Sequence, residues 1–257
     1  MDYKEFKKHI LTLTGIDLNA YKETQMKRRI DTIIRKNGCE GYQDYLSKIK
    51  IDKVLYEAFI NYLTINVSEF FRNPSQWVVL EQDIIPMLLK GKTSIKIWSA
   101  ACSTGDEPYT IAMIMSKILP LNQIKIMATD IDKEVLKKAQ EGLYIDKSVA
   151  NVPKAFLDKY FTKKERMYQI SDEIKKCVSF TQHNLLKDPY PNNVDLIVCR
   201  NVLIYFTEDA KNEIYKKFSA ALRKEGILFV GSTEQIIMSQ NFGIMPYKMF
   251  FYQKPSQ

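Results

Sequence analysis

Apolar residues recur at helical spacing through the first 70 positions and predict an all-α segment. The first expected helix ends at Gly15, and its apolar face is formed by Tyr3, Phe6, Ile10 and Leu13. A second helix is expected over residues 18–36, and two more over 42–49 and 53–63. Asn73 and Pro74 have the pattern of a helix cap followed by proline in the first turn, and the helix they introduce is expected to end near Gly91.

From residue 95 onward the pattern changes to short apolar runs that alternate with helical segments, which is typical of a mostly parallel sheet. The runs expected to form strands are 95–98, 124–128, 178–181, 194–199, 227–230 and 249–252. Aromatic and charged residues interrupt this alternation over 143–177 and suggest a small antiparallel insert. We therefore expect a helical domain over residues 1–72 and an α/β domain over 73–257, with the insert at about 145–180.

The stretch from Ile95 to Tyr109 predicts a strand, a loop of small residues and a helix that begins at Asp106-Glu107-Pro108. This is the first unit of a nucleotide-binding α/β fold, in which backbone amides at a helix N-terminus face a ligand. On this stretch alone, an ordinary turn between a strand and a helix explains the pattern about equally well.

An acidic residue follows the second expected strand, where dinucleotide folds place a ribose-binding carboxylate. Asp130 lies 25 residues after Gly105 and closer to the strand end than Asp132, which also suits a helix N-cap. Asp130 is therefore the better ligand candidate. Ahead of the α/β domain, Asn66, Ser68 and Arg72 are candidates to line a cleft; their alternative roles are turn formation and a surface cation.

The formal net charge of +8 favours an acidic partner, whether nucleic acid, anionic lipid or protein. Four cations of the second helix gather on one arc opposite its apolar face: Arg28, Arg29, Arg35 and Lys36. A solvated basic face explains them, and a docking surface for acidic protein helices is the competing hypothesis.

Two histidines and four scattered cysteines argue against a histidine-based metal site, a catalytic triad, zinc or disulfides. No apolar run approaches about 20 residues and the N-terminus lacks an apolar signal core, so we expect a cytoplasmic protein.

Six segments occur in one order along the chain and together resemble a known family. They are N-V-S-E-F-F-R (66–72), A-A-C-S-T-G-D-E-P-Y (100–109), A-T-D-I-D (128–132), H-N-L-L (183–186), C-R-N-V-L-I-Y-F (199–206) and F-V-G-S-T-E (229–234). The chain is similar in these segments to the chemotaxis receptor methyltransferases of the CheR type. The resemblance implies a Rossmann-like class I methyltransferase domain with a three-stranded β-insert, preceded by an all-α domain. It also implies transfer of a methyl group from S-adenosylmethionine to glutamate side chains on the cytoplasmic helical domains of chemoreceptors.

The same resemblance assigns residues to the site. The cofactor would be held by Asn66, Ser68, Arg72, Glu107, Asp130, Asn184, Leu185, Arg200 and Asn201. Arg72 and Tyr205 would lie nearest the reacting methyl group, with no metal required, and the basic arc would dock the receptor. We expect a monomer. Ser68 stands where the family commonly has threonine, and Asp106-Glu107 where Glu-Glu is usual. The insert lacks the glycine-containing loop of members that grip a receptor's C-terminal pentapeptide, so we expect this chain not to depend on one.

The chemistry and the residues are compatible, because a glutamate carboxylate with a pKa of about 4.3 is already ionised at neutral pH and needs no general base. Catalysis would then depend on positioning and electrostatics. Three alternatives remain. A nucleic-acid methyltransferase would carry an N-P-P-Y-like motif where this chain has residues 200–203, and an NAD-dependent oxidoreductase would carry G-x-G-x-x-G, of which only Gly105 is present. A non-catalytic receptor adaptor would keep its role when Arg72 or Tyr205 is replaced.

Overall fold

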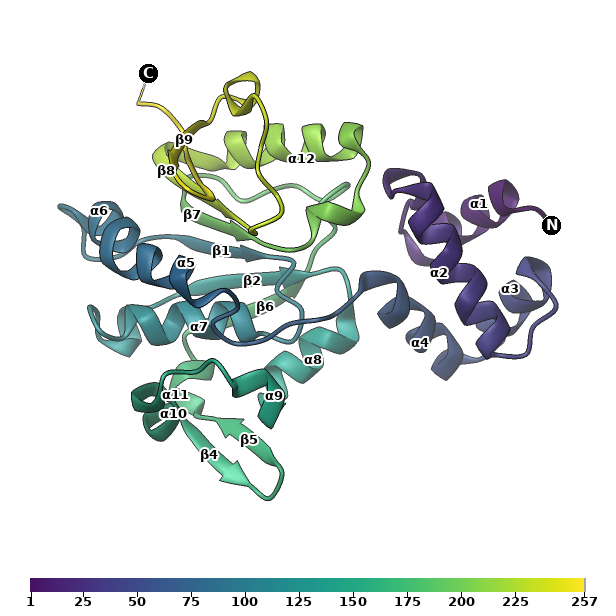
Figure 1. Cartoon of the computed structure of the whole chain (residues 1–257), viewed down its shortest axis with the longest axis horizontal. Helices are drawn as coiled ribbons and strands as arrows, with labels where there is room; N and C mark the ends of the chain where they lie inside the picture. The colour runs from purple at the N-terminus through teal and green to yellow at the C-terminus, as the bar shows by residue number, and fades with distance from the viewer. Residues whose placement is uncertain (257) are drawn as a thin grey trace. The chain divides into compact units, whose positions relative to one another are not determined.

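The chain divides into two compact units in the computed structural model, which describes residues 1–256. The first unit holds Met1–Asn66 and Ile204–Asn212, and the second holds Val67–Leu203 together with the residues from Glu213 on. The structure thus separates the units between Asn66 and Val67, whereas the sequence pattern placed the boundary at residue 72. The return of Ile204–Asn212 to the first unit was not expected. Each unit can be followed in Figure 1.

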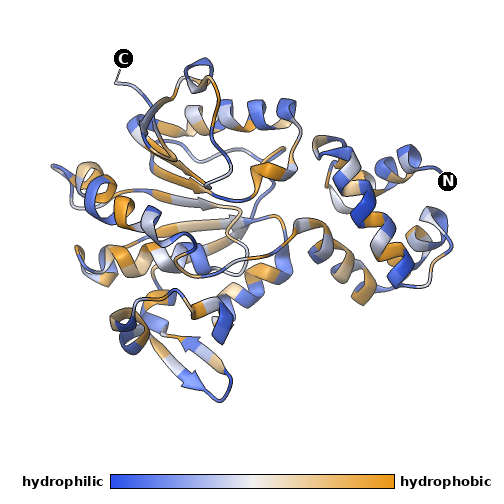
Figure 2. Cartoon of the chain, viewed as in Figure 1, coloured by the Kyte–Doolittle hydropathy of each residue, from blue (hydrophilic) through white to orange (hydrophobic). Residues whose placement is uncertain are grey.

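The first unit is helical. Its elements are α1 (Tyr3–Thr14), a 3-10 turn (Leu18–Ala20), α2 (Glu23–Lys36), α3 (Tyr42–Ile51) and α4 (Lys53–Thr64). The apolar faces predicted for α1 and α2 point inward, and the aromatic centre joins Phe59 to Phe6 and Tyr45 at ring separations of 6.4 and 5.5 Å. Figure 2 shows the alternation of apolar and polar residues along these helices. Amphipathic packing therefore accounts for this part of the fold.

The expectation of one continuous helix over residues 18–36 is wrong at its start. The chain is extended at Tyr21, which forms an antiparallel bridge with Phe206 and stacks on its ring at 4.7 Å. Lys22 N donates to the carbonyl of Tyr205 at 2.9 Å, and Thr207 N donates to the carbonyl of Ala20 at 2.8 Å. These contacts require extended backbone, so α2 begins only at Glu23.

The second unit is built on a seven-stranded sheet in the order β6-β2-β1-β7-β8-β10-β9. The strands are β1 (Ile97–Ala100), β2 (Ile126–Asp130), β6 (Val178–Gln182), β7 (Val194–Cys199), β8 (Leu222–Val230), β9 (Met245–Lys248) and β10 (Phe251–Gln253). The first five pair in parallel, and β10 and β9 are antiparallel. The predicted fold class is confirmed. The edge strand β9 was missed because all four of its residues are exposed and Pro246 interrupts the pattern.

Helices and a small second sheet surround these strands (Figure 1). The helical elements are α5 (Pro74–Val79), a π-helical turn (Leu80–Ile84), α6 (Ile85–Leu89), α7 (Asp106–Met115), α8 (Lys133–Glu141), α9 (Asp146–Val149), α10 (Lys154–Tyr160), α11 (Asp172–Lys175) and α12 (Glu208–Ala221). Short 3-10 turns cover Leu121–Gln123, Leu203–Tyr205 and Ser239–Phe242. The expected insert is a three-stranded antiparallel sheet in the order β3-β5-β4, formed by Leu143–Ile145, Met167–Ile170 and Phe161–Lys164. Within residues 1–256, no helix combines the length and the apolar character needed to cross a bilayer.

Candidate cofactor site

The loop between β1 and α7 lies where parallel strands end, the edge at which such sheets bind ligands. Ala101 and Ser103 have positive φ values of 62° and 48°, and Gly105 has 87°. A Cβ at Gly105 would lie 2.9 Å from the Cβ of Ala139, so the close packing of this loop on α8 requires glycine. The loop is tied to the neighbouring strand by Asp130, which accepts hydrogen bonds from Ser103 N at 2.8 Å and Asp132 N at 3.0 Å. The small residues of the sequence motif therefore form a compact turn against the end of β2.

Three carboxyl groups gather at this edge: Asp106 and Asp130 are buried, and the side chain of Glu107 is 13% exposed. Burial raises the pKa of Asp106 to about 6, although the Thr104 hydroxyl bound to it acts in the opposite direction. Burial also raises the pKa of Asp130 to about 6, against its bonds from backbone amides. Burial raises the pKa of Glu107 to about 7, opposed by Arg200 and by the Ser99 hydroxyl, which donates to Glu107 at 2.9 Å. This edge of the sheet is therefore rich in acceptors and suits a ligand that carries hydroxyl or ammonium donors.

Arg200 is the cation that faces these acids, and it is almost completely buried. Its guanidinium lies against the rings of Trp77 and Phe229, at 4.9 and 4.8 Å from their centroids, and the two rings meet edge to face beside it, 5.6 Å apart. Nη1 lies 3.7 Å from Glu107 Oε2, and Nη2 donates to the carbonyl of Arg72 at 2.8 Å and to Gln76 Oε1 at 2.6 Å. Burial lowers the pKa of Arg200, and the neighbouring Glu107 acts to raise it. Arg200 thus anchors the segment before α5 to the end of β7.

Arg72 and Ser68 lie in this anchored segment. The carbonyl of Arg72 also accepts from Trp77 Nε1 at 2.9 Å, and its Nη1 donates to the carbonyl of Val67 at 3.2 Å. The Arg72 cation acts to lower the pKa of Glu107, and the Ser68 hydroxyl acts to lower that of Asp106. Asn73 stands at the predicted N-cap position directly before Pro74, but its φ is 60° and its side chain makes no capping bond; its oxygen lies 3.4 Å from Arg200 Nη2 instead.

The remaining predicted cofactor residues divide between the two units. Asn184 follows β6; its N donates to Asp188 at 2.7 Å, its side-chain oxygen accepts from Leu186 N at 2.9 Å, and Leu185 beside it is buried. Asn201 follows Arg200 in the left-handed region, with a φ of 61°. Asn66 and Tyr205 belong to the first unit, where Asn66 Nδ2 donates to Thr64 Oγ1 at 2.8 Å. The structure therefore brings Ser68, Arg72, Glu107, Asp130 and Arg200 to one edge, and the approach of Asn66 and Tyr205 to it stays a prediction.

Glu234 is a buried residue of this edge that the sequence pattern did not select. Its carboxylate accepts from the backbone amides of Asn201 at 2.5 Å, Val202 at 2.8 Å, Leu203 at 2.7 Å and Gly231 at 2.9 Å. The motif F-V-G-S-T-E contained the signal, namely an acid three residues after a glycine at the end of a buried strand. Without the fold, nothing in the motif indicated which backbone amides that acid would bind.

The basic arc on α2 is made by three cations rather than four. Arg28, Arg35 and Lys36 are exposed. Arg29 turns inward, because its guanidinium lies 4.5 Å from the centroid of the Tyr62 ring and donates to the Tyr62 carbonyl. Arg29 lies four residues before Ile33, and this spacing places it next to the buried face of α2.

Comparison with known proteins identifies the family. Residues 66–251 match the model of the CheR methyltransferase SAM-binding domain, and residues 1–64 match that of the CheR methyltransferase all-alpha domain. The chain belongs to the CheR methyltransferase family. It is 41% identical over 254 residues to the chemotaxis protein methyltransferase of Listeria innocua, covering 98% of this chain and 97% of that one. It is 32% identical over 242 residues to the chemotaxis protein methyltransferase of Escherichia coli, covering 90% and 83%. Among solved structures, a TehB-like methyltransferase from Corynebacterium glutamicum aligns over 70% of this chain and 93% of that one, with a TM-score of 0.40 and 14% identity.

The residues at the carboxyl-terminal ends of the parallel strands fit the S-adenosylmethionine that this CheR domain binds. Four buried polar atoms there have no hydrogen-bond partner within the protein: Ser103 Oγ, Asp106 Oδ1, Arg200 Nε and Asn201 Oδ1. Buried polar groups are normally satisfied, so such a cluster indicates a polar ligand. Oxygen acceptors match the hydroxyl and ammonium groups of the cofactor. Among the described residues, no group of three or more histidine, cysteine, aspartate or glutamate side chains is arranged to hold a metal ion.

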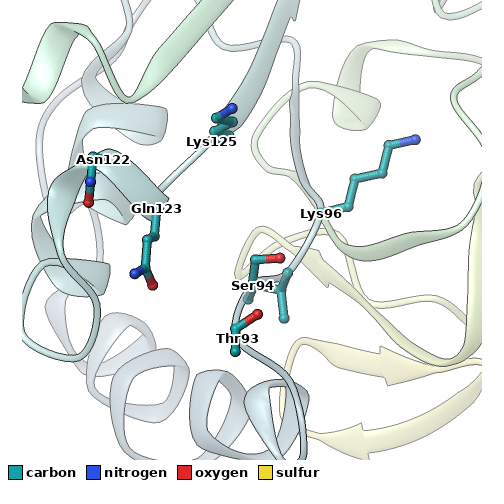
Figure 3. A pocket seen from close by; sticks show the side chains of 7 residues that line it. Thr93, Ser94, Lys96, Asn122, Gln123 and Lys125 are labelled. Carbon is teal, nitrogen blue, oxygen red and sulfur yellow. The ribbon is translucent and has the colours of Figure 1, made fainter.

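A separate cavity of the CheR methyltransferase domain lies at the other edge of the sheet. It has a volume of about 520 Å³ and is lined by residues just before β1 and β2, among them Lys96 and Lys125. Figure 3 shows Lys96 directed away from the other lining side chains, and its Nζ donates to the Asn192 carbonyl at 2.7 Å. None of the predicted site residues lines this cavity.

Proposed function

We propose that this CheR methyltransferase transfers a methyl group to the side-chain carboxylates of glutamates on the cytoplasmic helical domains of chemoreceptors, giving methyl esters. The observation that carries the proposal is the coincidence of the family motifs with one buried, acceptor-rich edge of the sheet. Relatives matched over 97% and 83% of their own length are named chemotaxis protein methyltransferases, which supports a role in chemotaxis. A cytoplasmic location is part of the proposal.

S-adenosylmethionine supplies the activated methyl group. The residues of the chain bind the cofactor, orient the reacting groups and exclude water. Asp130 and Glu107 offer acceptors, and Ser68, Asn184, Leu185, Arg200 and Asn201 complete the cofactor set with Asn66. Arg72 carries a guanidinium able to bind a carboxylate with two hydrogen bonds, either that of the substrate or that of the cofactor. Tyr205 is proposed to line the path of the methyl group. Because the substrate carboxylate is already ionised at neutral pH, no general base is needed.

The receptor is proposed to dock on the exposed cations Arg28, Arg35 and Lys36 of α2. Acidic helices are complementary to such a face, and complementary charge accelerates association more than it adds affinity. Binding of a receptor C-terminal pentapeptide is not part of the proposal, because only Glu165 and Arg166 separate β4 from β5 in the insert. No metal ion takes part, and the enzyme is proposed to act as a monomer.

The test is incubation with methyl-labelled cofactor and purified receptor cytoplasmic domains, followed by treatment with alkali. Glutamate methyl esters release volatile labelled methanol, whereas methylated nucleic acid and methylated amines do not. Labelled nucleic acid, or label on the receptor that resists alkali, would favour the alternative of a methyltransferase for another substrate. The variants Arg72→Ala and Tyr205→Phe should lose turnover while they stay folded. A non-catalytic adaptor would keep its role in both variants.

A further inference from the structure

Glu234 makes an unusual set of hydrogen bonds. It is 5% exposed, and its two carboxylate oxygens accept four backbone N–H groups from two separate loops. Oε1 accepts from Val202 and Leu203, and Oε2 accepts from Asn201 and Gly231. One side chain thus satisfies three consecutive amides of the loop after β7 and joins them to the loop after β8.

Only a carboxylate suits this arrangement. An ionised carboxylate accepts at both oxygens, whereas the amide of glutamine would direct an NH₂ group toward two N–H donors. The surroundings are also tight: a Cβ at Gly231 would lie 2.5 Å from Glu234 Oε2 and 2.9 Å from Asn201 N. The glycine therefore makes room for the carboxylate and for the amide that it binds.

The loop that Glu234 holds contains Asn201 in the left-handed region, with a φ of 61°. Asparagine adopts this conformation more readily than most residues other than glycine, and the bond from its backbone amide to Glu234 helps to hold it. Its Oδ1 is buried and has no partner within the protein. The backbone is thus fixed while one side-chain acceptor is left available, as expected where a side chain is held ready for a ligand.

We propose that Glu234 is a positioning residue for cofactor binding. Its carboxylate holds the turn Asn201–Leu203 and thereby sets the side chain of Asn201 toward S-adenosylmethionine. The inference rests on the proposed role of Asn201 in the cofactor site. Glu234 itself acts through the loop and does not touch the cofactor.

The main test compares Glu234→Gln with Glu213→Gln, a matched change at an exposed glutamate whose partner is Lys216. Calorimetry with S-adenosylhomocysteine should show at least tenfold weaker binding for Glu234→Gln and no change for Glu213→Gln. Hydrogen exchange followed by mass spectrometry should show faster exchange in peptides covering residues 199–205. Unchanged affinity in a folded Glu234→Gln protein, or unchanged exchange of that loop, would overturn the proposal.

Gly231→Ala keeps the test decisive if Glu234→Gln does not fold, and Glu234→Asp adds a second comparison if it does. Gly231→Ala should displace the carboxylate and reproduce the loss of affinity and the faster exchange. Glu234→Asp keeps two acceptor oxygens and should bind cofactor better than Glu234→Gln; the reverse order would mean that side-chain length matters and the acceptors do not, which overturns the proposal.

The outcome is separable from that of the proposed function. Cofactor binding and exchange need no receptor, so a wild-type protein that binds cofactor but does not methylate receptors would refute the substrate alone. Asn201→Ala should weaken cofactor binding as much as Glu234→Gln does. Normal cofactor binding by the Asn201→Ala protein would show that Asn201 does not contribute to binding, and it would overturn the proposal.

Discussion

Arg200 Nη2 donates to the backbone carbonyl of Arg72 at 2.8 Å and so joins two motifs that lie 128 residues apart. The same guanidinium lies against two aromatic rings and beside Glu107. The sequence predicted both arginines as cofactor residues, and the structure shows that one of them holds the backbone of the other. Arg200 therefore supports the site mechanically as well as electrostatically.

Replacing Arg200 by lysine should destabilise the protein by about 2–4 kcal/mol, because an ammonium cannot supply the planar set of donors or pack as a flat group against the two rings. Burial would also favour loss of its charge, leaving Glu107 without a cation. Urea unfolding gives the free energy, and calorimetry should show weaker cofactor binding. Arg166→Lys, at the exposed turn between β4 and β5, is the matched control and should change neither quantity. An equally stable Arg200→Lys protein would show that the anchoring contacts contribute little.

Glu107 should make stability depend on pH in a direction opposite to that of an acid whose pKa is lowered by its partners. Its pKa rises from 4.5 to about 7 in the folded protein because it is buried. Between these values the folded state holds a proton that the unfolded state has released, so stability falls as pH rises, by up to about 3 kcal/mol. Below pH 4.5 both states are protonated and the penalty disappears.

The variant Glu107→Gln should remove this pH dependence. Asp106 and Asp130 titrate in a similar range, so the informative quantity is the difference between variant and wild type at each pH. The variant should gain stability relative to wild type from pH 4.5 to 7, with no further gain above, while its cofactor affinity falls. A difference that is flat with pH in urea unfolding would contradict the raised pKa.

The sequence predicted the sheet well because buried strands and close turns follow from local patterns. The apolar runs of β1, β2 and β7 mark buried strands, and small residues after β1 mark a close turn. What it missed depends on distant partners. Tyr21 leaves the helical pattern because Phe206 pairs with it, and the side chain of Asn73 makes no capping bond because its oxygen faces Arg200. Tertiary contacts overrode local propensity at both places.

The basic face of α2 is expected to serve receptor methylation and not cofactor binding. Arg28→Glu combined with Arg35→Glu should raise the KM for receptor by at least tenfold, because it replaces attraction by repulsion at two exposed positions. Cofactor affinity should stay unchanged. The control Lys4→Glu with Lys8→Glu makes the same change in net charge at exposed positions of α1. Equal effects of the two pairs would mean that net charge, and not a docking face, determines receptor methylation.

Asp195 is expected to stabilise the fold from the edge opposite the cofactor site. It lies at the start of β7 and accepts from Lys92 Nζ at 2.6 Å, from Lys96 N at 2.8 Å and from Arg223 Nε. Burial acts to raise its pKa, but these three bonds outweigh burial and the pKa is lowered below 3.8. Its stabilisation is therefore fully present above pH 3.8 and is lost as pH falls through the lowered value.

Asp195→Asn should cost about 3 kcal/mol near neutral pH, because asparagine loses both ionic partners and offers a single acceptor oxygen. The difference from wild type should shrink as the pH falls below 3.8, where the wild-type carboxyl also becomes protonated. Cofactor affinity at neutral pH should not change, since Asp195 stands at the amino end of β7 and the predicted cofactor residues stand at the other. A loss of cofactor affinity in a folded Asp195→Asn protein would show that the two edges of the sheet are coupled. The prediction that Asp195 affects stability and not cofactor binding would then be wrong.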